Sequence, residues 1–192
     1  MLPRIGLVSI VLVLALGCGG PGSFNGEVAG NRLAVHDAVF FPFSDTDTGE
    51  ILGVRVELGD VADLCADAKA LRTRKNATYV DIDVFRLNQD ATWFLSPDKG
   101  TYTVIDRSAA QPPNFAYADF WRSDANCFNV VGSSNSSGRS GTVDVESIAF
   151  TGDGSITGKF DITFGSQNDK VTGSFNASRC DAPETTAGYN CE

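Results

Sequence analysis

Short stretches in which apolar and polar residues alternate recur along this chain and constrain its fold more than any other feature. In residues 51–58, Leu52, Val54, Val56 and Leu58 share one face of an extended segment, and polar residues or glycine occupy much of the other. A period of two is that of a β-strand with one buried face. Similar stretches recur every 8–12 residues or so, which predicts a mostly β protein, an antiparallel β-sandwich or barrel of about ten strands with one short helix.

The expected strands cover residues 24–30, 33–43, 51–58, 78–87, 92–95, 101–105, 115–122, 127–131, 142–150, 155–164 and 170–178. Two of the last three carry the same pattern, an aliphatic residue followed by Thr, Gly, a polar residue and Phe. A glycine in mid-strand marks a bulge or a close neighbouring backbone. We therefore expect Gly158 and Gly173 to let their strands curve, with Phe160 and Phe175 covering the gaps.

One helix is expected over residues 60–72, with Asp60 as its N-cap. An apolar stripe at helical spacing would pack it on a sheet; the stripe consists of Val61, Leu64, Cys65, Ala68 and Leu71. Residues 132–141 are rich in Ser and Gly, so we expect them to form a flexible loop within the domain.

The amino-terminal eighteen residues have the features of an export signal. Arg4 is followed by thirteen uncharged residues, 5–17, which is shorter than the roughly 20 apolar residues that a membrane-spanning helix needs. Ala15-Leu16-Gly17-Cys18 resembles the lipobox of bacterial lipoproteins, with Ala15 and Leu16 where that family usually has Leu and a small residue.

This resemblance implies cleavage before Cys18, a diacylglyceryl thioether on its sulfur, and an acylated amino terminus that includes palmitate-type chains. The expected organisation is a signal peptide at 1–17, a lipidated tether at 18–23 and one β-rich domain at 24–192. Gly19 is similar to the outer-membrane sorting class of the family, so the expected location is the cell envelope, anchored in the outer membrane. An ordinary secretory signal, which would leave Cys18 as a spare thiol, is the alternative.

Charge and cysteine content agree with export. Removal of residues 1–17 leaves 14 basic and 24 acidic side chains, a net charge of −10, which disfavours nucleic acid as a partner. Besides Cys18 there are four cysteines, and an even number in an oxidising compartment predicts two disulfides. Three pairings are open. We favour Cys65–Cys180 with Cys127–Cys191, which would tie the helix to the last strand and the tail to the body. Zinc is disfavoured because no C-x-x-C pair occurs.

Residues that could carry catalysis are few. His36 is the single histidine, and no nucleophile elbow, zinc-protease or nucleotide-binding motif accompanies it. Asp81 and Asp83 share the outward face of one expected strand, so a hydrolase that uses acidic residues is one hypothesis; a solvated strand face is the simpler interpretation. The chain is therefore predicted not to be an enzyme.

Two groups of residues are candidates for binding. Asp45, Asp47 and Glu50 place carboxylates around a turn, as a calcium loop does, although an acidic turn without metal is the favoured interpretation. Phe115 and Tyr117 share a strand face that Trp121 can join; such a face either binds sugar rings or an apolar ligand, or belongs to the core.

The sequence thus favours an envelope-anchored lipoprotein that acts as a non-enzymatic binding or structural module, attached to the membrane through Cys18. No cofactor is required, and its protein or small-molecule partner is not specified. A carrier of an apolar ligand in a β-pocket is the first alternative. A carbohydrate-active or calcium-dependent binding protein is the second.

Overall fold

A closed barrel of eight strands forms the body of this protein in a computed structural model, which describes residues 20–182 and 190–192. The barrel strands are β2 (Asp37–Ser44), β3 (Ile51–Gly59), β5 (Thr78–Leu87), β7 (Gly100–Ile105), β8 (Asn114–Arg122), β9 (Gly138–Ile148), β10 (Ser155–Phe164) and β11 (Asp169–Arg179). The expected signal peptide and Cys18 lie outside the described residues. The expectation of a mostly β barrel or sandwich is confirmed.

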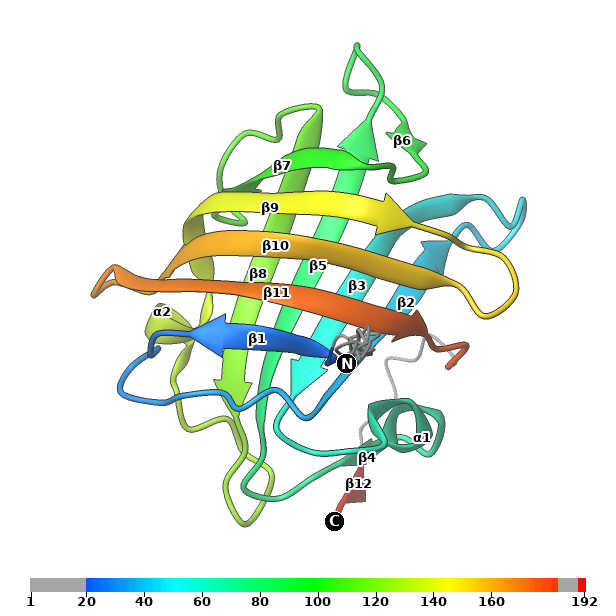
Figure 1. Cartoon of the computed structure of the whole chain (residues 1–192). Coiled ribbons are helices and arrows are strands. Elements are labelled where there is room, and N and C mark those ends of the chain that lie inside the picture. Colours follow the sequence, from blue (N-terminus) through cyan, green and yellow to red (C-terminus); the bar gives the residue numbers. More distant parts are fainter. Residues whose placement is uncertain (1–19, 183–189) are drawn as a thin grey trace, which may run out of the picture.

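The barrel consists of two antiparallel sheets that cross one another, one behind the other in Figure 1. The rear sheet has the order β2-β3-β5-β8, and the front sheet has the order β7-β9-β10-β11. Two parallel seams close the barrel: β7 meets β8, and β11 meets β2. Each seam contains only two residue pairs in register, whereas β10 and β11 pair over their whole lengths.

Short elements extend or cover this body. β1 (Gly22–Asn25) pairs with β11, β6 (Phe94–Leu95) pairs with β5, and β4 (Arg72–Thr73) pairs with β12 (Asn190–Cys191). The helices are α1 (Leu64–Lys69) and α2 (Ser133–Ser136). Among the described residues, neither has the length or apolar character needed to span a membrane.

Large apolar side chains from both sheets fill the barrel interior. Phe40 and Phe120 come from the rear sheet and Tyr102 and Phe164 from the front sheet, and all four are buried in one continuous core. Of the apolar face predicted for residues 51–58, Val54, Val56 and Leu58 are fully buried there and Leu52 is half-buried. Val80, Ile82 and Val84 of β5 are fully buried beside them. Burial on this scale is the main favourable term in folding.

The repeated Gly-x-Phe pattern of β10 and β11 has the expected role. Gly158 lies opposite Phe175, and Gly173 lies opposite Phe160. A Cβ atom on either glycine would overlap the phenylalanine ring across from it, so each ring occupies the space above a glycine. A register shift in the β9–β10 ladder at Thr157 and Gly158 provides the irregularity that a mid-strand glycine indicates.

The helix is shorter than predicted because two aspartates have other partners. Asp60 accepts a hydrogen bond from the backbone N–H of Thr78 (2.8 Å), which holds residue 60 in the approach to α1. Asp37 on β2 accepts from the N–H of Leu64 (2.9 Å) and so satisfies the first turn in place of the predicted N-cap. Leu64 is buried outside the barrel against Val39 and Tyr79 of the rear sheet.

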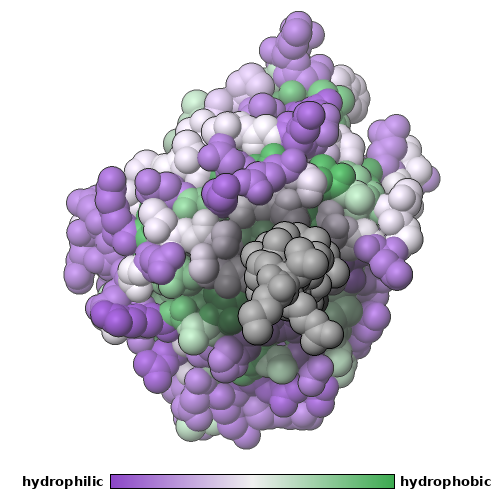
Figure 2. Space-filling model, viewed as in Figure 1, coloured by the Kyte–Doolittle hydropathy of each residue, from purple (hydrophilic) through white to green (hydrophobic). Residues whose placement is uncertain are grey.

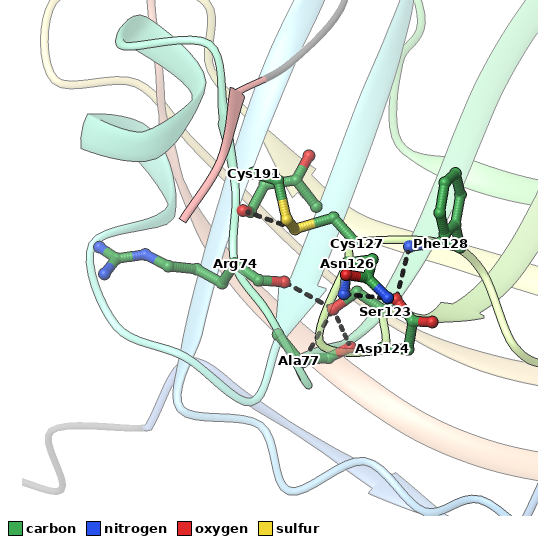
Figure 3. Close-up of a disulfide and its surroundings, with 9 residues drawn as sticks. Arg74, Ala77, Ser123, Asp124, Asn126, Cys127, Phe128 and Cys191 are labelled. Carbon is green, nitrogen blue, oxygen red and sulfur yellow. Dashed lines mark hydrogen bonds between the residues drawn. A yellow bond between two sulfur atoms is a disulfide. The ribbon is translucent and has the colours of Figure 1, made fainter.

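Both favoured disulfides are present. Cys65–Cys180 ties α1 to the end of β11 with a Cα–Cα distance of 5.5 Å, and Cys127–Cys191 ties the loop after β8 to β12 at 5.7 Å. Figure 3 shows the second disulfide beside Ser123, whose hydroxyl donates to the carbonyl of Arg74 and accepts from the N–H of Ala77. Ser123 is buried, so these bonds attach the loop to the segment that precedes β5.

Several expected boundaries are wrong. Residues 132–141, expected as a flexible loop, contain α2 and the start of β9, and Gly138 is buried with no room for a side chain against Ala118. Residues 127–131 make one isolated bridge instead of a strand. The expected tether at 18–23 is also too long, because Gly22 and Ser23 already pair with β11. In each case tertiary pairing decides the structure where composition favours a loop or a strand.

Candidate functional site

The outward faces of the two sheets differ sharply in chemistry. The front sheet exposes small polar side chains and a few charges, including Thr103, Thr142, Asp161, Thr172 and Asn176, and Figure 2 shows hydrophilic residues over much of this side. The rear sheet instead carries aromatic rings, carboxylates and an arginine, nearly all of them half-buried or buried. The rear face therefore has the convergent side chains expected of a binding site.

Cross-strand register arranges the rear face in four rows, each with one residue from β2, β3, β5 and β8. In order from the α1 end, the rows are Asp37, Gly59, Tyr79 and Trp121; Val39, Glu57, Asp81 and Asp119; Phe41, Arg55, Asp83 and Tyr117; and Phe43, Gly53, Phe85 and Phe115. Residues opposite one another in neighbouring strands have side chains in contact range. The rows thus place charged groups between two aromatic ends.

Five rings at the end of this face form what we call the aromatic platform: Phe43, Phe85, Phe94, Phe115 and Tyr117. Phe85 is its centre, with ring centroids 5.8 Å from Phe43, 5.6 Å from Phe94, 5.3 Å from Phe115 and 6.0 Å from Tyr117. Phe94 is 42% exposed and Phe115 is buried beneath its neighbours.

The platform depends on a glycine in β3. A Cβ atom at position 53 would overlap the ring of Phe85 and press on that of Phe43. Gly53 therefore lets these two rings stack almost parallel, at an interplanar angle of 7°. Exposed Trp93 and Leu95 flank Phe94 in the chain.

An ion network lies beside the platform. Asp83 accepts hydrogen bonds from Nε and Nη2 of Arg55 (2.7 and 3.1 Å), and Arg107 pairs with Asp119 (2.6 Å) and more distantly with Asp83 (3.6 Å). The guanidinium of Arg55 lies over the ring of Phe43. The guanidinium of Arg107 lies over the ring of Tyr117, 4.6 Å from its centroid. Each arginine thus contacts both a carboxylate and a ring of the platform.

Two carboxyl groups, Glu57 and Asp81, face each other in the next row. Desolvation, reinforced by the charge of Asp81, raises the pKa of Glu57 to about 8. Desolvation also raises the pKa of Asp81 to about 7, against the attraction of Arg55. Oδ1 of Asp81 is buried and has no hydrogen-bond partner among the described residues. The pair therefore retains a proton near neutral pH.

The α1 end of the face is closed by packing. Tyr79 and Trp121 stack at 4.1 Å, and Leu64 of α1 occupies the space above Gly59 beside Tyr79. The stack is part of the small cluster beneath the helix. This end therefore stabilises the attachment of α1, and the opposite end is left open to a ligand.

The predicted ligand residues have divided roles. Phe115 and Tyr117 are brought together, at 5.4 Å, inside the platform. Trp121 lies on the same face but at its closed end, against Tyr79. Asp81 and Asp83 do point outward, as predicted; the expectation of a solvated face is wrong, since Asp83 is only 5% exposed and is held by Arg55.

The other candidates remain apart from this face. Oδ1 of Asp45 accepts three hydrogen bonds, from the N–H groups of Asp47 and Thr48 and from the Thr48 hydroxyl, so it closes its own turn. Over residues 20–182 and 190–192, no three His, Cys, Asp or Glu side chains are grouped to hold a metal ion, Glu50 included. His36 is exposed in the segment before β2.

Sequence reasoning missed the partners that complete the site. Phe43 lies far from Phe85 in the chain, and their rings meet only because β2 and β5 both pair with β3. Phe94 reaches Phe85 through the pairing of β6 with β5. Arg55 and Phe85 were present in the alternating patterns as outward residues of two expected strands. The opposite charges of Arg55 and Asp83 and the outward positions of both were the available signal, but the strand order needed to combine them was not. Comparison of the chain with protein-family models, curated proteins and solved structures finds no match.

Proposed function

We propose that this protein is an envelope lipoprotein whose barrel is a non-enzymatic binding module, and that it binds through the aromatic platform. The single observation that carries the binding assignment is the open aromatic end of the rear face, with Phe94 exposed and Phe85 in contact with four other rings. Exposed aromatic clusters beside polar groups are typical of interaction sites.

The filled interior favours binding at the surface over carriage within the barrel. Phe40, Phe120, Phe164 and Tyr102 occupy the space between the two sheets at 0–1% exposure. A carrier would need that space for its ligand. We therefore place ligand contact on the outside of the rear sheet.

The lipid anchor is supported by the sequence around Cys18 and by the start of the fold. β1 begins at Gly22, and the N–H of Asn176 on β11 donates to the carbonyl of Pro21 (2.8 Å). Few residues thus separate the proposed anchor from the barrel. Several acyl chains, at about 0.8 kcal/mol per buried methylene, would make attachment effectively permanent.

Expression of the full chain in a bacterial host tests the anchor. The wild type should partition into the detergent phase of Triton X-114 and carry added acyl mass on a product that starts at Cys18. Cys18→Ser should lose that mass and enter the aqueous phase. A wild-type product that still contains Met1, or that has no acyl mass, would refute the anchor.

A photo-crosslinking amino acid tests the binding face. With p-benzoylphenylalanine in place of Phe94, irradiation of intact cells should give an adduct of higher mass. The control places it at Phe128, which is 70% exposed in the loop beside Cys127–Cys191 and points away from that disulfide in Figure 3. Equal labelling at both positions, or none at position 94, would contradict the proposed face.

A further inference from the structure

We propose that the ligand of the aromatic platform is a neutral oligosaccharide, recognised by ring stacking and by hydrogen bonds from the arginines and polar groups beside the rings. This inference rests on the proposed function, because it names the ligand of the same face. It is argued from three properties of the face: the arrangement of rings, the available donors and the charge.

Phe94 is the ring that can receive the flat face of a sugar, and the other rings support it. Phe43, Phe85 and Phe115 stack on one another, at interplanar angles of 7° and 23°, and so form a fixed apolar base beside Phe94. Phe94 adjoins Phe85 and is the most exposed ring of the five. The C–H faces of pyranose rings pack on aromatic faces, because such rings present an apolar surface to C–H groups.

Hydrogen-bonding groups border the same rings. Arg55 binds Asp83 through Nε and Nη2, which leaves Nη1 without a partner among the described residues. The Tyr117 hydroxyl accepts from Gln111 Nε2 (2.8 Å) and keeps its own proton for donation. The side chains of Arg55 and Arg107 are 37% and 53% exposed. A ligand on the platform can therefore exchange hydroxyl hydrogen bonds with fixed donors and acceptors.

The face has no excess of cations, in a chain of net charge −9. Arg55 and Arg107 balance Asp83 and Asp119 in contact pairs. Glu57 and Asp81 in the neighbouring row hold a proton between them, since their pKa values are raised by burial. Both arginines are already paired with carboxylates, so an anionic polysaccharide would find no excess of cations here, and a neutral one fits better.

The test uses the full chain, purified in detergent with its acyl groups, and a panel of neutral hexasaccharides: cellohexaose, xylohexaose, mannohexaose, maltohexaose and chitohexaose. Isothermal titration should detect at least one of them. Phe94→Ala should weaken that binding about tenfold, because one stacked ring is lost. Phe128→Ala, which removes an equally apolar exposed ring outside the platform, should leave binding unchanged.

Charged probes and salt separate the outcomes. Binding of the neutral hexasaccharide should be insensitive to salt between 50 mM and 500 mM NaCl, and polygalacturonate and dextran sulfate should not compete. If no neutral hexasaccharide binds while position 94 still crosslinks in cells, the ligand class is wrong and the binding face stands. If both experiments fail, the proposed function fails. Because Phe94 is exposed, its loss should not unfold the barrel; Phe85→Ala provides a second variant whose melting temperature is measured alongside.

Discussion

At the scale of single residues, the unusual feature is the pair of carboxyl groups in the second row of the rear face. Glu57 and Asp81 are opposite one another across β3 and β5, and Oδ1 of Asp81 is buried without a partner among the described residues. Like charges directly opposite on a sheet repel. Retention of a proton removes that repulsion, and it links the stability of the barrel to pH.

The sign of this linkage follows from the direction of the pKa shifts. The ordinary pKa values of these carboxyl groups are 4.5 for Glu57 and 3.8 for Asp81, and burial raises them to about 8 and about 7. The unfolded chain releases these protons near pH 4, whereas the folded chain holds them up to about pH 7–8. The contribution of the pair to the free energy of unfolding is therefore greatest below about pH 4 and falls as pH rises to about 8.

Glu57→Gln should remove most of the loss of unfolding free energy that the wild type shows as pH rises from 4 to 8. The variant should melt at a higher temperature than the wild type at pH 8, and the difference between the two should shrink as pH falls to 4. Thermal melts followed by circular dichroism at several pH values measure this difference in melting temperature. Glu146→Gln, at an exposed position paired with Lys159, is the control and should show no such trend. A constant difference between Glu57→Gln and wild type across this range would contradict the raised pKa.

At the scale of elements, alternation in the sequence predicts most strands because one face of each strand is buried in the barrel. The inward residues of β3 and β5 and the full extent of β10 follow from that pattern alone. α1 and β9 do not follow from it. Asp37, far from α1 in the chain, supplies the helix cap, and β9 gains its first residues by pairing with β10 through Gly138.

The paired glycines of β10 and β11 give a sharp test at this scale. Gly158→Ala would place a methyl group against the ring of Phe175 and the neighbouring backbone. Overpacking of this kind costs about 1–3 kcal/mol of unfolding free energy. Urea denaturation should show that loss, whereas Thr172→Ala on the exposed side of β11 should change the free energy by less than about 0.5 kcal/mol. Equal effects of the two substitutions would mean that the ring does not occupy the glycine gap.

At the scale of the whole molecule, the disulfides were predictable because four cysteines allow few pairings and the tail needs an attachment. The platform was not predictable, since it requires the strand order β2-β3-β5-β8 and the position of β6. Phe115 and Tyr117 could be identified as neighbours within one strand. Their contacts with Phe85 arise only when β5 pairs with β8.

The two disulfides should contribute unequally to stability. Replacement of Cys65 and Cys180 by alanine opens a loop of 115 residues and removes a covalent link to buried Cys180, so a loss of about 2–5 kcal/mol is expected. Replacement of Cys127 and Cys191 opens a shorter loop of 64 residues that holds the two-residue strand β12, and its cost should be smaller. Guanidinium denaturation of both double variants measures the two losses of unfolding free energy. A larger loss for the Cys127 and Cys191 variant would contradict the prediction.

The brevity of the two parallel seams has a consequence for how the barrel comes together. Each four-stranded sheet is a continuous antiparallel ladder, and at each seam only two residue pairs in register join the two sheets. The N–H of Cys180 donates to the carbonyl of Phe40 (2.9 Å) next to the β2–β11 seam. The Cys65–Cys180 disulfide, which links β11 to α1, therefore lies at the end of that seam. We therefore expect the barrel to form by docking of the two sheets around their shared apolar core. A disulfide reinforces the β2–β11 seam, whereas the β7–β8 seam depends on its two residue pairs and on side-chain packing.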